Sequence, residues 1–205
     1  NVSGADDVVL NVTRVWSSTF NPRSIIARAR LNLPLNYDPI GVAVLTMVDA
    51  KAAGVLFTVN PVNGDESKVA IEGSFGFGEA VVSGNVTPDR YLVDKITYEI
   101  EERVVSDKGA EFVYNPETKD MEYKELPPDQ KKLPCLEDKE ILELAKLARK
   151  VEDHFGCPQD VEWSISRSLP FPQSIFLVQR NMSMKMRHFF QTFSVAPPDF
   201  LLLAY

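Results

Sequence analysis

The sequence predicts an α+β fold in which a mostly antiparallel sheet is flanked by helices. Residues 41–48 and 54–59 are short apolar runs joined by a link too short for a parallel crossover, which indicates antiparallel strands. Turn residues in the stretches 91–105 and 111–125 indicate two β-hairpins. The stretch 138–155 carries an apolar stripe at helical spacing, and Gly156 follows it as a C-terminal stop.

The remaining elements follow from the same patterns. Residues 6–17 predict a helix, and Pro22 opens a second, short helix that runs to Arg28. The proline-rich stretch 127–134 predicts a linker. Further strands are predicted at 68–72, 161–165 and 175–178, and a glycine-rich loop at 73–79.

Composition excludes several classes of protein. The chain has 205 residues, a net charge of −7 and an apolar fraction of 44%, which suits a globular protein with a core. The acidic balance argues against a nucleic-acid binder, which needs a basic face. No apolar run reaches the roughly 20 residues that span a bilayer, so no membrane partner is expected. The two cysteines fit neither a disulfide framework nor a zinc site, and a cytoplasmic setting is expected.

The last two predicted strands carry the strongest chemical signal. Asp160 and Glu162 are two residues apart and share a face of their strand, and Gln179 ends the following strand. A hairpin would bring Glu162 close to Gln179. Carboxylate and amide oxygens suit Mg²⁺ that is held together with nucleotide phosphates. A solvated strand face is the competing interpretation of the same spacing.

Other candidate residues are less specific. Gly76, Gly78 and Gly84 allow close backbone approach to an anion, although a plain tight turn is the alternative. Arginines on the first two helices suit phosphate binding or a solvated face: Arg14, Arg23, Arg28 and Arg30. The histidines, His154 and His188, have no nucleophile nearby in the sequence, so a histidine-based triad is not supported.

Ordered segments along the chain resemble motifs of the pyruvate phosphate dikinase and phosphoenolpyruvate synthase family. WSSTF at 16–20, with PRSI at 22–25, is similar to W-A-S-L-F … R-A-I. MV at 47–48, continuing to AGVLFTVNP at 53–61, is similar to M-V … S-G-V-x-F-T-x-N-P. GFGEAVVSG at 76–84, with TPD at 87–89, is similar to G-L-G-E-A-V-V-S-G … T-P-D. DVEW at 160–163, with VQ at 178–179, is similar to D-x-E-W … L-Q-S-R-P.

The resemblance implies an ATP-grasp nucleotide-binding domain over residues 1–181, lacking its N-terminal lobe, with a tail or linker at 182–205. It implies transfer of the β-phosphate of ATP to a histidine on another domain, release of AMP, and later phosphorylation of pyruvate on a further domain. The cofactors implied are ATP and Mg²⁺. Glu162 and Gln179 would be catalytic residues and, with Asp160, metal ligands; the implied nucleotide contacts are Glu79, Gly76, Gly78, Met47 and Arg180.

Three departures from the family pattern leave alternatives open. Leu45 stands where the family has a glutamine that faces the nucleotide, and Asn181 stands where it has an arginine. The family's lysine and main glycine-rich phosphate loop have no counterpart in this sequence, so the isolated chain is expected to be inactive. The alternatives are a relative that phosphorylates rifamycin or phenol, and a non-catalytic nucleotide-binding or interaction module.

Overall fold

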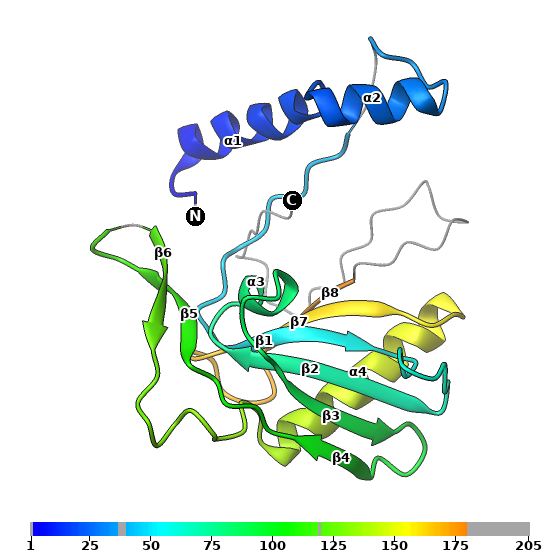
Figure 1. Cartoon of the computed structure of the whole chain (residues 1–205), viewed down its shortest axis with the longest axis vertical. Helices are drawn as coiled ribbons and strands as arrows, with labels where there is room; N and C mark the ends of the chain where they lie inside the picture. The colour runs from blue at the N-terminus through cyan, green and yellow to red at the C-terminus, as the bar shows by residue number, and fades with distance from the viewer. Residues whose placement is uncertain (1, 37–39, 119, 180–205) are drawn as a thin grey trace. The chain divides into compact units, whose positions relative to one another are not determined.

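The computed structural model describes residues 2–36, 40–118 and 120–179 of the protein (Figure 1). These residues belong to two compact units, the first ending at Met47 and the second beginning at Val48, and each is described by itself. Arg180, Asn181, His188 and the predicted tail at 182–205 lie outside the described residues.

The first unit contains the two predicted helices, α1 (Ala5–Ser18) and α2 (Pro22–Arg30). Asn21 caps α2 by accepting a hydrogen bond from the backbone N–H of Ser24, and Pro22 occupies the first turn. Arg28 is buried and donates to the backbone carbonyls of Thr19 and Pro34. Arg28 therefore closes the turn between the helices, in contrast to the phosphate contact for which it was a candidate.

The second unit is built on a sheet. In the described residues its order is β4-β3-β2-β1-β7-β8, with every neighbouring pair antiparallel, as the sequence predicts. The hairpin of β5 and β6 forms a separate two-stranded sheet (Figure 1). The strands span β1 Ala50–Phe57, β2 Lys68–Phe75, β3 Asp89–Asp94, β4 Ile100–Val104, β5 Ala110–Asn115, β6 Asp120–Glu125, β7 Asp160–Ser166 and β8 Ile175–Gln179.

The predicted strand at 41–48 is wrong. These residues form no ladder in the structure, and the first strand of the sheet begins at Ala50. The expected partner strand, β1, is flanked by β2 on one edge and by β7 on the other. Both edges of β1 are thus occupied, which leaves no hydrogen-bonding edge of β1 for the 41–48 run despite its apolar residues.

One face of the sheet packs on the helix α4 (Asp138–Phe155), and this contact makes the core. Inward-facing strand residues such as Leu56, Ile71 and Val161 pack with Ile141 and Leu144 of the helix, all fully buried. The helix begins where the Glu140 carboxylate accepts the backbone N–H of Glu137, and it ends at the predicted Gly156 in a left-handed conformation. The predicted helix 138–155 is confirmed.

A tryptophan fixes the centre of this face. The indole of Trp163 is buried and donates to the backbone carbonyl of Val55 over 3.1 Å. A Cβ atom at Gly73 would lie 2.4 Å from the Trp163 ring, so only glycine leaves room for the indole here. Packing therefore requires glycine at position 73. Because β2 extends to Phe75, the glycine loop is shorter than the predicted 73–79.

A buried ion pair joins the start of β3 to two connecting segments. The side chains of Asp89 and Lys108 are fully buried, with the Lys108 ammonium 2.5 Å from the Asp89 carboxylate. Asp89 also accepts the backbone N–H groups of Ser106, at 2.9 Å, and Cys135, at 2.8 Å. One carboxylate thus holds the segment after β4 and the segment before α4 against β3.

The buried thiol of Cys135 makes the free energy of unfolding fall as the pH rises in the alkaline range. Burial raises the pKa of its thiol well above the ordinary value, so the unfolded chain loses the proton first as pH rises. The resulting stabilisation is complete below about pH 8.5 and is lost above it. Between pH 7.5 and 9.5 we expect the free energy of unfolding to fall by about 1.4 kcal/mol more in the parent protein than in Cys135→Ala. Urea unfolding at both pH values measures this, and equal falls would contradict it.

Candidate functional site

The predicted carboxylates lie on the sheet face opposite α4. Both belong to β7, on either side of Val161, whose side chain is fully buried in the core. Because side chains alternate along a strand, Asp160 and Glu162 point to the other face. Both are only partly buried, so two carboxylates lie on this face of the sheet.

A third carboxylate lies in the same row across the sheet. Val55 of β1 stands opposite Glu72 on one side and opposite Glu162 on the other. Directly opposed residues share a face, so Glu72 and Glu162 flank Val55, with backbones about 10 Å apart. Sequence reasoning missed Glu72, although its place between Ile71 and Gly73, which both face the core, is a usable signal of an outward residue.

The register between β7 and β8 determines which residue of β8 lies opposite Glu162. Glu162 stands opposite Val178, and Gln179 stands opposite Val161. Regular alternation therefore places position 178 on the face of Glu162. Gln179 is the last residue of β8, and its side chain lies outside the described part of the chain, as does Arg180. Met47 and Leu45 belong to the first unit.

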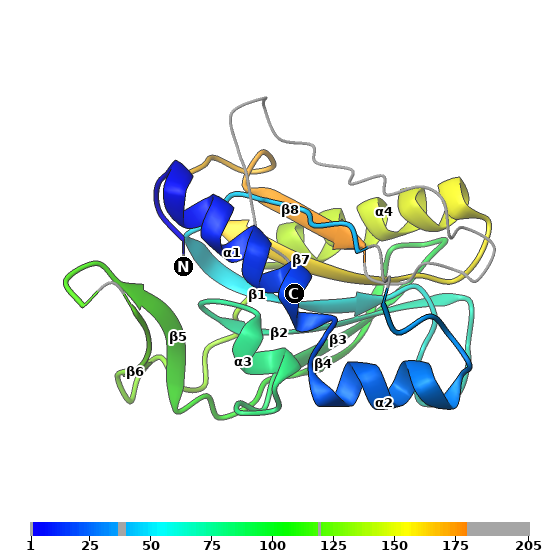
Figure 2. The same cartoon turned by 90° about the horizontal axis from the view of Figure 1, so that it is seen from above.

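The glycine loop reaches the same face as Glu162. The short helix α3 (Glu79–Val82) follows the loop and packs on β1 and β2, with Ala80 buried. Figures 1 and 2 show α3 and α4 on opposite sides of the sheet. The Cβ position of Gly78 lies 3.5 Å from the Cβ of Ala53, which is two residues from Val55 in β1. The structure thus brings Gly78 and the predicted carboxylates to one face. Glu79 begins α3 and is exposed.

Gly76 and Gly78 of the loop differ in their backbone conformation and in the space around their Cα atoms. Gly76 has φ +80, and a Cβ atom there would lie 2.2 Å from the backbone oxygen of Phe112. Its N–H donates to the carbonyl of Lys51, so the fold alone explains this glycine. Gly78 has φ −65, and a Cβ atom there would make only ordinary contacts. The fold therefore has space for a side chain at 78, where Gly78 is the N-cap residue of α3.

The donor set suits a metal ion that arrives with a nucleotide. Within the described residues, no group of three or more histidine, cysteine, aspartate or glutamate side chains is placed to hold a metal ion. Mg²⁺ is usually bound through one or two carboxylates together with phosphate oxygens and waters. Asp160 and Glu162 fit that pattern, and they do not fit a metal centre made by protein ligands alone.

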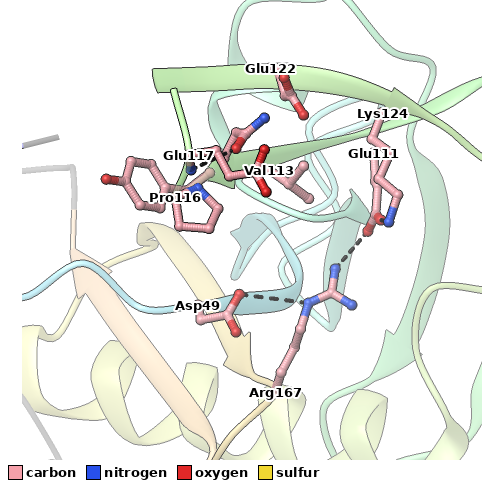
Figure 3. Close-up of a pocket in the computed structure, with 10 residues that line it drawn as sticks. Asp49, Glu111, Val113, Pro116, Glu117, Glu122, Lys124 and Arg167 are labelled. Carbon is pink, nitrogen blue, oxygen red and sulfur yellow. Dashed lines mark hydrogen bonds and ion pairs between the residues drawn. The ribbon is translucent and has the colours of Figure 1, made fainter. Parts of the chain in front are cut away.

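A separate open pocket of about 480 Å³ lies between the β5–β6 hairpin and the segments around Asp49 and Arg167 (Figure 3). No residue of the predicted site lines it. Its charged lining residues are Asp49, Glu111, Glu117, Glu122, Lys124 and Arg167. Carboxylates outnumber cations there, and the Arg167 guanidinium already lies 2.6 Å from a carboxylate oxygen of Glu111. An anionic triphosphate would gain little from such a pocket, so we place the candidate site on the sheet face.

Comparison with known proteins identifies the family of the chain and agrees with its fold. Residues 1–190 match the family described as pyruvate phosphate dikinase, AMP/ATP-binding domain. The chain belongs to this family. Its antiparallel sheet with flanking helices is accordingly an α+β fold of the ATP-grasp type, as the sequence predicts.

The chain is also similar to proteins named phosphoenolpyruvate synthase. The chain is 40% identical over 174 residues to the phosphoenolpyruvate synthase of Pyrococcus furiosus, covering 82% of this chain and 21% of that protein. It is 46% identical over 165 residues to the probable phosphoenolpyruvate synthase of Methanothermobacter thermautotrophicus, covering 80% of this chain and 24% of that protein. The chain therefore spans about a quarter or less of the length of these relatives. No helix in the described residues is both long and apolar enough to cross a membrane.

Proposed function

We propose that this chain is the ATP-binding part of a dikinase, and that it binds Mg·ATP on the sheet face that carries Glu162. The nucleotide's β-phosphoryl group passes to a histidine on another domain, and AMP is released. The observation that carries the proposal is the placement of Gly78, Asp160 and Glu162 on one face of a domain that belongs to an AMP/ATP-binding family.

The residues on this face suit phosphoryl transfer. Such reactions need positioning and charge neutralisation more than covalent help from the protein. Gly78 leaves space for a phosphate to approach the backbone, and the sheet holds Asp160 and Glu162 at fixed positions on the same face. Mg²⁺ held by these carboxylates would supply neutralisation of the phosphate charge. Gln179 joins the ligand set if β8 departs from regular alternation at its last residue.

Pyruvate is the proposed final acceptor of the phosphate. The relatives that support this carry the name phosphoenolpyruvate synthase, and none of those compared above is named for rifamycin or phenol. A histidine-bearing domain and a pyruvate-binding domain are the proposed partners. Two free cysteines, Cys135 and Cys157, support a reducing, cytoplasmic setting for the reaction.

Replacing Gly78 with alanine tests the site. The added methyl group fits the fold but would occupy the space proposed for a phosphate, so we expect Mg·ATP to bind about tenfold more weakly or worse while the melting temperature stays unchanged. Isothermal calorimetry measures the affinity. It should be run on the chain alone and on the chain mixed with the N-terminal lobe of the Pyrococcus furiosus phosphoenolpyruvate synthase.

Gly109→Ala is the matched control, because a Cβ atom at Gly109 meets no atom within 4 Å and Gly109 is not among the residues of the proposed site. This variant should bind like the parent protein. Equal affinities in Gly78→Ala and Gly109→Ala would show that no phosphate approaches Gly78. Failure of the parent protein to bind Mg·ATP even with the added lobe would count against the proposed function as a whole.

A further inference from the structure

The segment from Gly76 to Asn85, which contains Gly78 and α3, is held at its start by the β5–β6 hairpin. The backbone N–H of Phe77 donates to the carbonyl of Phe112 over 2.8 Å, and Gly76 forms a parallel bridge with Phe112. Phe112 is buried, and its carbonyl lies where a side chain at residue 76 would stand. The beginning of the loop therefore cannot shift without moving β5.

The end of the segment is held by the same hairpin. The side-chain amide of Asn85 donates to the hydroxyl of Tyr123 over 2.9 Å. The backbone N–H of Asn85 donates to the carbonyl of Ala80, which ties Asn85 to α3. Tyr123 is the direct cross-strand partner of Phe112, and the two rings lie 4.6 Å apart between centroids. The cross-strand pair of Phe112 and Tyr123 thus forms hydrogen bonds to both ends of the segment from Gly76 to Asn85.

The hairpin itself is fixed to the body of the second unit. The Glu111 carboxylate, one residue before Phe112, receives a hydrogen bond of 2.6 Å from Arg167, which follows β7 (Figure 3). At the base of the hairpin the N–H of Leu126 donates to the carbonyl of Gly109, and the preceding residue, Lys108, is in the buried ion pair. The hairpin that holds the loop is therefore itself attached to the unit whose sheet carries Glu162.

We propose that Phe112 and Tyr123 are positioning residues that set the height of Gly78 and α3 over the carboxylate face and thereby tune nucleotide affinity. This inference rests on the proposed function for its nucleotide. Tyr123 acts through Asn85 on the end of the segment, and Phe112 acts through its carbonyl on the start. A displaced α3 would place Gly78 away from the phosphate while leaving the core intact.

Tyr123→Phe tests the inference because it removes only the hydroxyl that receives the Asn85 amide. The Kd for Mg·ATP should rise about threefold to tenfold, the range expected for one hydrogen bond. Asn85→Ala should give a similar rise, and the double variant should be no weaker than the weaker single variant, since both remove one interaction. Tyr114→Phe is the matched control: Tyr114 lies in the same hairpin, and no hydrogen bond of its hydroxyl occurs in the described contacts.

Hydrogen exchange gives a readout that needs no nucleotide. Amides of residues 78–86 should exchange about threefold to tenfold faster in Tyr123→Phe than in Tyr114→Phe, while the amides of α4 stay equally protected. Equal exchange in the two variants would contradict the claim that Tyr123 holds the segment in place. Faster exchange with an unchanged Kd would contradict the role of Tyr123 in nucleotide affinity. Absence of Mg·ATP binding by the parent protein would contradict both the proposed function and the role of Tyr123 in nucleotide affinity. The exchange experiment would still show whether Tyr123 holds the segment.

Discussion

Replacement of Glu162 by alanine is expected to lower AMP formation about 100-fold or more, because it removes an oxygen ligand that neutralises phosphate charge through the metal ion. Activity should be measured in a chimera in which this domain replaces the matching segment of the Pyrococcus furiosus phosphoenolpyruvate synthase. Glu162→Gln keeps the size of the side chain and should be nearly as impaired, since an amide carries no negative charge.

Glu66→Ala is the control for this experiment. It removes the same charge from an exposed turn between β1 and β2, and AMP formation should stay within a factor of two of the parent chimera. Thermal unfolding of each variant separates a catalytic loss from a folding defect. Near-normal turnover in a folded Glu162→Ala chimera would remove this carboxylate from the proposed metal site.

Lys108→Met is expected to have the largest effect on stability, a loss of about 3–5 kcal/mol in the free energy of unfolding. Methionine preserves most of the side-chain volume but leaves the carboxylate of Asp89 buried without its cation. Two backbone N–H groups still donate to Asp89, and they cannot replace a full positive charge. Urea unfolding at neutral pH measures the difference.

Lys131→Met provides the comparison. Lys131 lies 2.9 Å from Glu125, a contact nearly as short as that of the buried pair, but the Glu125 side chain is 81% exposed. Solvent-exposed pairs contribute little, so this variant should lose less than about 1 kcal/mol. Similar losses in the two variants would mean that burial of the Asp89–Lys108 pair has no special energetic weight.

Local patterns in the sequence predicted most of the second unit. The helix at 138–155 was predictable because its apolar stripe and its glycine stop lie within the segment itself. Alternation alone placed Asp160 and Glu162 on one face, since that inference needs only the strand to which they belong. The hairpins were predictable for the same reason, because turn residues set them locally.

Features that depend on distant residues were not predictable. The apolar run at 41–48 reads as a strand by itself, and only the pairing of β1 with β2 and β7 shows that no edge of β1 remains for it. The register of β7 with β8 fixes Val178 opposite Glu162, and spacing along the chain cannot reveal a register. The grip of Phe112 on Gly76 joins residues 36 positions apart and has no local signal.

The two tryptophans of the protein are divided between its units, and this gives each unit its own optical signal. Trp16 in α1 is 53% exposed, whereas Trp163 in β7 is only 2% exposed. The indole of Trp163 lies on the α4 side of its strand, behind Glu162, so its emission reports on core packing more than on a bound nucleotide. Trp16→Phe would leave fluorescence from the second unit alone, and its melting curve could then be recorded separately.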